Sequence, residues 1–470
     1  MLRRYAFWKM VALSVVCAAA LVGPPSLAAA AKARLIVLTD VSNEPDDEES
    51  LVRLLAYSNE YDLEGMVATT SVWLQHGTRA DLIRRDVNAY GEVRENLLQH
   101  APGFPPASEL LSRVKSGSEE FGMLGVGPNR SSEGSRLIIE AVDRPDERPI
   151  WVAVWGGSNT LAQALWEVKY TRSPAELRRF IAKLRVYTIS DQDDAGRWMR
   201  ITFPDLFYVV SPSAVDGSEY YLATWTGISG DRQYKNGPMD HLDLVDNPWL
   251  TQHVIEGHGP LGALYPKLKY IMEGDTPSFL NLIGNGLGSA ESPTYGGWGG
   301  RYELRQSYAE TRPIYTNSRD TVTTSDGRTF TSNQATIWRW REAFQHDFAA
   351  RMEWCVKPRN AANHNPIAMV NGVGGKDVIE INARSGDTIR LTSEGSSDPD
   401  GNSLAVRWYQ YPEAGTSQAQ IDLKSATAKD TTFTVPPGEA GRTIHVILEL
   451  CDNGDPPLYA YRRVIVHVQP

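Results

Sequence analysis

The first two thirds of the chain alternate short apolar runs with amphipathic segments, and this rhythm constrains the fold more than any other feature. Each apolar run leads into a polar or Gly-rich turn and then into helical spacing. We expect strands at 35–38, 63–70, 150–154 and 184–189, and helices at 50–57, 78–99, 160–166 and 334–353. This alternation predicts an α/β unit with a mostly parallel sheet flanked by helices, whose ligands bind at the carboxyl ends of the strands.

The texture changes after residue 356. Residues 357–366 are predicted to form a linker between an α/β unit at 34–356 and a second unit at 367–470. Beyond the linker, Asp/Gly/Pro turns separate short alternating segments, a pattern typical of a β-sandwich of about 100 residues. We expect its strands at 378–381, 388–391, 404–411, 431–435, 443–450 and 461–468.

The N-terminus has the pattern of a secretory signal. Positive residues precede an apolar run at 11–22, and small residues follow it, so we expect residues 1–30 to be removed. The run is too short to span a bilayer, and no membrane span is expected in the mature chain. The protein is therefore predicted to be secreted, periplasmic or extracellular. Cys355 and Cys451 then remain, either as one bridge or as two separately buried thiols.

Charge and aromatic content narrow the classes of partner. The chain has 47 Lys and Arg against 57 Asp and Glu, a formal net charge of -10, which disfavours phosphate backbones and anionic membranes. Nucleic acid is therefore not an expected partner. The 13 Trp and 20 Tyr supply many flat rings, which either stack on sugars or pack in the core.

An acidic turn follows the first predicted strand. It holds six carboxylates within ten residues: Asp40, Glu44, Asp46, Asp47, Glu48 and Glu49. Carboxylates at this density repel one another unless a cation neutralises them or water screens them, and a hard divalent ion prefers such oxygen ligands. The alternative is a solvated acidic helix start that the helix dipole favours.

Several longer motifs resemble a known family. Residues 38–47 and the turn and helix at 155–165 are similar to the calcium-dependent inosine-uridine nucleoside hydrolases. Residues 43–47, 187–194, 223–228 and 273–278 resemble a narrower group, the secreted bacterial nucleoside-hydrolase-like, cellulose-binding proteins with a C-terminal Ig-like domain. The likeness extends over nearly the whole mature chain.

The resemblance implies a bound Ca²⁺ and names its ligands. The matching positions are Asp46, Asp47, Asn159 and Asp275. The position that matches the family's general base is Ser42. Asp40 is therefore the provisional catalytic base, and Glu44 is the other carboxylate near enough in sequence. The late His that serves nucleoside-directed members is replaced by Gly274, so a nucleobase substrate is not supported.

Other side chains are candidates for contacting the substrate. Asn43, Glu44 and Glu273 lie in the shared motifs, Asp191 and Asp193 follow a predicted strand, and several Trp lie near strand ends or in a Gly-rich loop: Trp73, Trp198, Trp225 and Trp298. The alternatives are a helix-capping loop for the two Asp and core packing for the Trp.

Together these features predict a secreted, calcium-dependent glycosidase of nucleoside-hydrolase type that acts on a furanoside or plant-type saccharide. The alternative is a carbohydrate-binding protein that has lost turnover, which the missing carboxylate at position 42 favours. The expected partner is a saccharide or nucleoside-like small molecule, or a polysaccharide such as cellulose.

Overall fold

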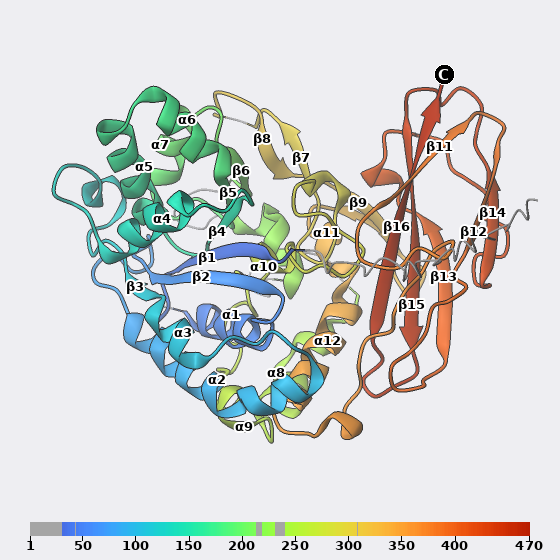
Figure 1. Cartoon of the computed structure of the whole chain (residues 1–470), viewed down its shortest axis with the longest axis horizontal. Helices are drawn as coiled ribbons and strands as arrows, with labels where there is room; N and C mark the ends of the chain where they lie inside the picture. Colours follow the sequence, from blue (N-terminus) through green and yellow to red (C-terminus); the bar gives the residue numbers. More distant parts are fainter. Residues whose placement is uncertain (1–30, 43, 213–218, 231–239, 308) are drawn as a thin grey trace, which may run out of the picture.

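A computed structural model describes residues 31–42, 44–212, 219–230, 240–307 and 309–470 (Figure 1). The predicted signal segment 1–30 and Asn43 lie outside the described residues. Within the described ranges, no helix is both long enough and apolar enough to cross a bilayer.

An eight-stranded sheet forms the centre of the larger unit, in the order β3-β2-β1-β4-β5-β6-β8-β7. All neighbours in this sheet are parallel except β7 and β8. This confirms the mostly parallel sheet. The strands are β1 (Ala33–Thr39), β2 (Tyr61–Ala68), β3 (Val114–Ser116), β4 (Ile150–Val154), β5 (Leu184–Thr188), β6 (Phe207–Val210), β7 (Tyr302–Arg305) and β8 (Ile314–Asn317).

Helices cover both faces of this sheet (Figure 1). Apolar residues of one face join a core with α1 (Pro45–Ala56), α2 (Ala80–His100), α3 (Ala107–Ser112) and α12 (Arg341–Trp354). Those of the other face join a core with α4 (Glu133–Asp143), α5 (Asn159–Thr171), α6 (Pro174–Lys183) and α7 (Ala195–Thr202). The central strands β1, β2, β4 and β5 are buried on both sides, which explains their continuous apolar runs.

The expected single helix at 334–353 is wrong, because the structure breaks it in two. A short α11 (Ala335–Trp338) ends before Trp340, whose backbone (φ -106°, ψ 4°) precedes α12. The break directs the Trp340 side chain into the interface between the two units, which we call the seam. There its ring contacts those of Tyr411 and Tyr461. Packing across the seam thus overrides the helical periodicity of the segment.

The C-terminal unit is rich in strands, as predicted. A four-stranded sheet in the order β11-β16-β15-β13 accompanies the pair β12-β14. Trp408 is buried in the core of this unit. The strands are β11 (Ile379–Arg384), β12 (Thr388–Thr392), β13 (Leu404–Gln410), β14 (Asp430–Thr434), β15 (Thr443–Asp452) and β16 (Tyr459–Gln469).

Backbone and buried charge join the two units. The Tyr461 N–H donates to the carbonyl of Asn285 at 3.3 Å, and the fully buried Arg463 donates to the carbonyls of Leu287 and Tyr295. A side chain on Gly286 (φ 87°) would collide with the Tyr461 carbonyl. The second unit is therefore fitted closely to the first.

The two cysteines are free thiols, so the bridge considered from the sequence does not form in this structure. Cys355 is fully buried and Cys451 is partly exposed. The structure agrees with the alternative of two separate thiols, except that only Cys355 is fully buried.

Candidate metal and saccharide site

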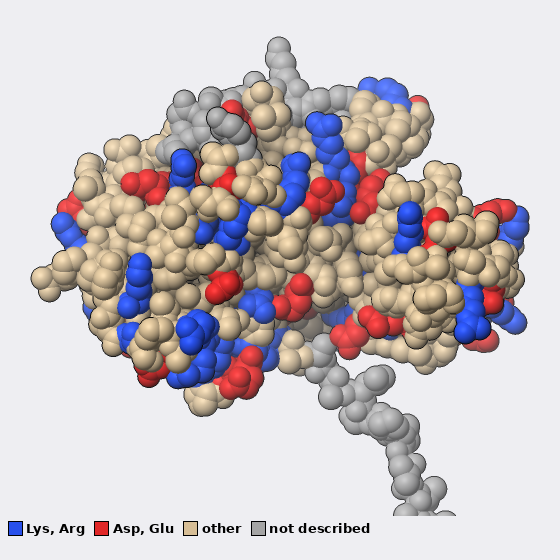
Figure 2. Space-filling model, turned by 90° about the horizontal axis from the view of Figure 1, so that it is seen from above, with Lys and Arg blue, Asp and Glu red and all other residues tan. Residues whose placement is uncertain are grey.

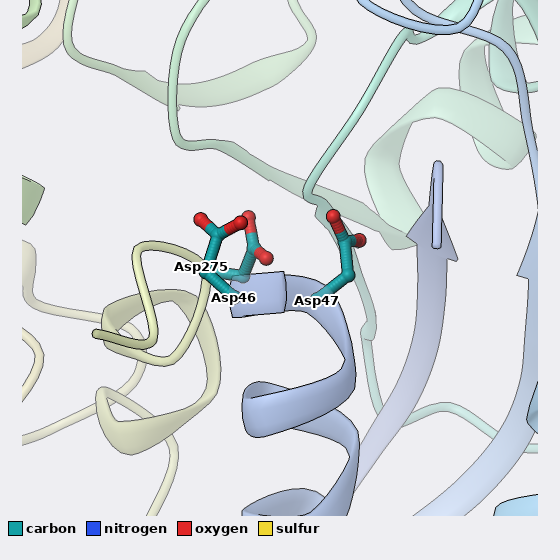
Figure 3. A group of neighbouring side chains, drawn as sticks. All are labelled: Asp46, Asp47 and Asp275. Atoms are coloured by element: carbon teal, nitrogen blue, oxygen red, sulfur yellow. The ribbon is translucent and has the colours of Figure 1, made fainter. Parts of the chain in front are cut away.

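Three carboxylates converge beyond the carboxyl end of the sheet. Asp46 and Asp47 lie in the first turn of α1, and Asp275 comes from the loop before the short helix α10 (Pro277–Leu280). Each offers an oxygen within 4.8 Å of the others, and all three residues are buried. Figure 3 shows Asp275 beside Asp46 at the start of α1.

The electrostatics of this group favour a cation. Burial, followed by repulsion from Glu44 and Asp40, raises the pKa of Asp46 to about 8. Burial and neighbouring carboxylates also raise the pKa of Asp47 and of Asp275 well above the ordinary value. One buried oxygen of Asp275, Oδ2, has no hydrogen-bond partner among the described residues. An oxygen-only donor set of this charge fits Ca²⁺.

The same face of α1 that carries Asp46 also holds the loop of Asp275. Glu49 accepts the backbone N–H of Glu273 at 2.9 Å, and Arg53 pairs with the Glu273 carboxylate at 2.5 Å. Positions 46, 49 and 53 lie on one face of a helix. The helix therefore supplies two of the carboxylates and positions the third.

Glu273 is held in a buried network next to the cluster. It is fully buried, and besides Arg53 its carboxylate accepts hydrogen bonds from Tyr265 at 2.7 Å and Thr276 at 2.9 Å. Its φ of 52° is unusual for a residue with a side chain. These contacts occupy the carboxylate that the sequence suggested for substrate binding, and we assign Glu273 a positioning role instead.

Asp40 directly follows β1, lies beside the cluster and is nearly fully buried. The Ser71 hydroxyl donates to its Oδ2, and burial raises the pKa of Asp40 despite this bond. A side chain at Gly156 would collide with the other oxygen, Oδ1, so the glycine allows this close approach. Similarly, the Thr39 hydroxyl donates to Asp47 and fixes its direction.

Asn159 and Asp193 form a second polar group at the start of α5. The Asn159 side chain donates to Thr70 Oγ1 at 2.9 Å and to the Glu120 carbonyl at 2.7 Å. Asp193 accepts the Asn159 and Ala195 backbone N–H groups, and burial raises the pKa of Asp193 to about 6. Asp193 thus caps the N-terminal ends of both α5 and α7, in line with the capping alternative.

The structure does not bring Asp191 and Trp198 to the cluster. Asp191 forms a bidentate ion pair with Arg200, which also pairs with Glu310 at 2.7 Å. Trp198 is half-buried and packs edge-on against Phe203, against the core between the sheet and α4–α7. Both residues therefore stabilise α7 and its surroundings.

An aromatic wall, made of Trp73, Tyr220 and Trp225, leads from the cluster to the surface. A Cβ on Gly274 would lie 2.9 Å from both Asp46 and the Trp225 ring, so Trp225 borders the cluster. Tyr220 contacts Trp225 edge-on at 5.1 Å, and Trp73, which is 38% exposed, contacts Tyr220 at 6.4 Å. Trp298, in contrast, is buried beside Tyr461 at the seam.

Position 42 offers no base. Ser42 is exposed and its φ is 108°, a backbone conformation that side chains rarely adopt. Glu44, two residues on, is half-buried, and its charge raises the pKa values of Asp46, Asp47 and Asp275. Asp40 and Glu44 thus add their charge to that of the cluster.

Three residues that hold the site together were not expected from the sequence: Arg53, Ser71 and Tyr220. Glu49 was expected only as part of the acidic turn, although the helical spacing of Asp46, Glu49 and Arg53 indicates their shared face. No local pattern links Ser71 to Asp40 or Tyr220 to Trp225, because these contacts join distant segments.

The fold and this site define a nucleoside-hydrolase-like α/β protein with a C-terminal β-sandwich. Residues 34–302 match the family model for "Cellulose-binding Sde182, nucleoside hydrolase-like domain", and residues 388–468 match that for "Cellulose-binding protein Sde0182, C-terminal domain". The chain belongs to this cellulose-binding Sde182 family, which confirms the resemblance seen in the sequence.

A solved structure supports this assignment. A nucleoside hydrolase-related hypothetical protein from Saccharophagus degradans that is associated with carbohydrate metabolism is 38% identical, with a TM-score of 0.81. The alignment covers 93% of this chain and 100% of that chain. A search of curated proteins gives no match.

More distant structures add nothing about function. The effector protein XOO4466 is 11% identical over 61% of this chain and 87% of its own, with a TM-score of 0.31. The type III effector XopQ complexed with adenosine diphosphate ribose is 12% identical over 70% and 94%, with a TM-score of 0.26.

Proposed function

We propose that the chain is a calcium-dependent glycosidase of nucleoside-hydrolase type, exported after removal of residues 1–30, that acts on a furanoside or plant-type saccharide. The convergence of Asp46, Asp47 and Asp275 within 4.8 Å, with Asp40 beside them, carries this proposal. The family's cellulose-binding description and the relative associated with carbohydrate metabolism support a saccharide as the ligand.

Hydrolysis of a glycosidic bond passes through an oxocarbenium-like state and needs a positioned water. Ca²⁺, when bound, would orient the water and the sugar hydroxyls and make the water more acidic. Asp40 would take the proton, since its raised pKa suits a base. The Ser71 hydroxyl holds Oδ2 of Asp40 and so fixes the direction of the carboxylate.

The aromatic wall would contact the leaving group of the substrate. Trp225 borders the cluster, while Trp73 is partly exposed, so the rings extend from the reaction centre toward solvent. Flat rings with polar edges pack against sugar faces and still donate hydrogen bonds. The Trp73 Nε1–H donates to the Tyr220 hydroxyl at 3.3 Å and links two of the rings.

One observation favours a second candidate function. Ser42 stands at the position of the family's carboxylate base and has a strained backbone, while the three carboxylates Asp46, Asp47 and Asp275 converge. A protein with this site would bind a saccharide through the ion without cleaving it. We therefore retain a carbohydrate-binding protein without turnover as the alternative.

Release of reducing sugar from a panel of furanosides and polysaccharides, with calcium and with chelator, tests both. Calcium-dependent release supports the glycosidase. Calcium-dependent binding of a saccharide by calorimetry without release supports the alternative. Equal results with calcium and chelator in both assays contradict the role of the ion.

A further inference from the structure

A groove of about 250 Å³ lies between the start of α12 and the four-stranded sheet of the C-terminal unit. Figure 1 shows α12 beside this sheet. Trp340 and Glu342 contribute from the larger unit, and Arg407, Glu449 and Tyr459 from β13, β15 and β16. None of the three clustered Asp lines it. The groove is therefore distinct from the candidate metal site.

Aromatic rings form one side of the groove. Tyr459 and Tyr461 lie nearly parallel, with an interplanar angle of 14° and centroids 6.4 Å apart. Trp340 meets Tyr461 edge-on at 5.9 Å, and its Nε1–H has no hydrogen-bond partner among the described residues. Tyr461 and Trp340 are buried and fix the wall, whereas Tyr459 is half-buried.

Both signs of charge line the groove. Arg339 and Arg407 contribute together with Glu342 and Glu449; Arg407 lies 3.6 Å from Glu449, and Arg339 also pairs with Asp320 at 2.9 Å. An anion would meet the two carboxylates and a cation the two guanidinium groups, so neither has a clear advantage. A neutral ligand with many hydroxyls uses both kinds of group, because each hydroxyl donates and accepts. Figure 2 likewise shows acidic and basic side chains interspersed over one face of the molecule.

We propose that this groove is a second binding site, for a neutral oligosaccharide such as a segment of a polysaccharide chain. The half-buried Tyr459 ring packs against a sugar face, and the Arg and Glu side chains bind the hydroxyls. The choice of a saccharide rests on the proposed function, but the site needs no cation. Its role is to let the C-terminal unit hold a polymer while the larger unit binds its own ligand.

Cys451 gives a direct test, because it lines the groove and is partly exposed, whereas Cys355 is fully buried. Burial raises the pKa of both thiols, to about 11 for Cys451 and about 12 for Cys355, so the comparison between them rests on their exposure. The full chain is treated with a maleimide, with and without cellotetraose, and labelling of each Cys peptide is followed by mass spectrometry. We expect cellotetraose to slow labelling of Cys451 several-fold, equally with calcium and with chelator. Unchanged labelling at saturating cellotetraose, or protection that the chelator abolishes, would overturn the proposal.

Variants give an independent test. Tyr459→Ala should weaken cellotetraose binding in calorimetry at least tenfold, while calcium binding stays unchanged and shows that the larger unit is intact. The control is Arg390→Ala, an exposed residue of β12 that pairs with Asp430 away from the groove. Wild-type affinity in Tyr459→Ala, or equal loss in Arg390→Ala, contradicts the groove. Asp47→Asn should leave protection of Cys451 intact, so failure of the metal site is distinguishable.

Discussion

Asp47 and Glu48 are neighbours on α1, yet their side chains face different surroundings. Asp47 points into the cluster, whereas Glu48 pairs with Arg85 of α2 at 3.1 Å. Asp47→Asn should lower calcium affinity at least tenfold, because it removes a charged ligand and leaves the fold intact. Calcium titration calorimetry measures the change, and Glu48→Gln should bind as wild type. Equal affinities for all three proteins would exclude the ion site.

Asp40 should be needed for turnover and not for the ion. Asp40→Asn keeps the size of the side chain and its bond with Ser71, but it removes the base. We expect the rate on any accepted substrate to fall at least a hundredfold, with calcium affinity retained within a few-fold. Rate measurements on the panel above test this. A wild-type rate would assign the base elsewhere.

A third residue, Asp86, should make stability depend on pH. It is buried, one oxygen has no partner among the described residues, and burial raises the pKa of Asp86 to about 7 despite the neighbouring Arg85. The folded chain then binds more protons than the unfolded chain between about pH 4 and 7, so this group's contribution falls as the pH rises.

Asp86→Asn mimics the protonated acid and should raise the free energy of unfolding by about 1–2 kcal/mol above pH 7, with little change near pH 4. Urea unfolding at both pH values measures the difference. A gain that is equal at both values would contradict this assignment of the pKa.

At the scale of single elements, α1 is the scaffold of the site. Its buried Arg53 pairs with Glu273 and thereby holds the loop of Asp275. Arg53→Met should lower the free energy of unfolding by about 3–5 kcal/mol, because it leaves Glu273 buried without its cation. Calcium affinity should fall as well, since the loop is released.

A double variant separates the two effects of Arg53. Arg53→Met with Glu273→Gln removes both charges and should recover part of the stability in urea unfolding. Calcium affinity should stay low, because the loop is still not tied to α1. Recovery of full affinity would show that Arg53 acts only through the uncompensated charge.

The elements were more predictable than the contacts between them. Apolar runs located β1, β4 and β5 closely, because strands buried on both faces need continuous apolar sequence. The convergence of Asp275 with Asp46 and Asp47 followed from the resemblance. Trp198 was expected to contact the substrate, but it packs against the core on the α4–α7 side of the sheet. Its position after a strand does not indicate on which side of the sheet the ring packs. The break before Trp340 depends on a partner surface more than sixty residues away.

The whole molecule should unfold as one unit. Gly286 has a positive φ, and a Cβ at this position would collide with the Tyr461 carbonyl. Gly286→Ala therefore introduces both a collision and backbone strain at the seam. Differential scanning calorimetry should show one transition for wild type and two for the variant. Gly288→Ala is the matched control, since its Cβ would meet nothing closer than 3.4 Å. A single unshifted transition in Gly286→Ala would show that the units are not coupled there.

The close fit around Gly286 and Arg463 also bears on how such proteins diversify. Domains joined by a flexible linker can be exchanged independently. Here the C-terminal unit donates hydrogen bonds to backbone carbonyls of the larger unit. A sandwich transplanted onto an unrelated α/β unit would lose those acceptors. In proteins with this architecture, the contacting residues of the two units should therefore change together. Chimeras of distant members should fold only when both units come from the same parent.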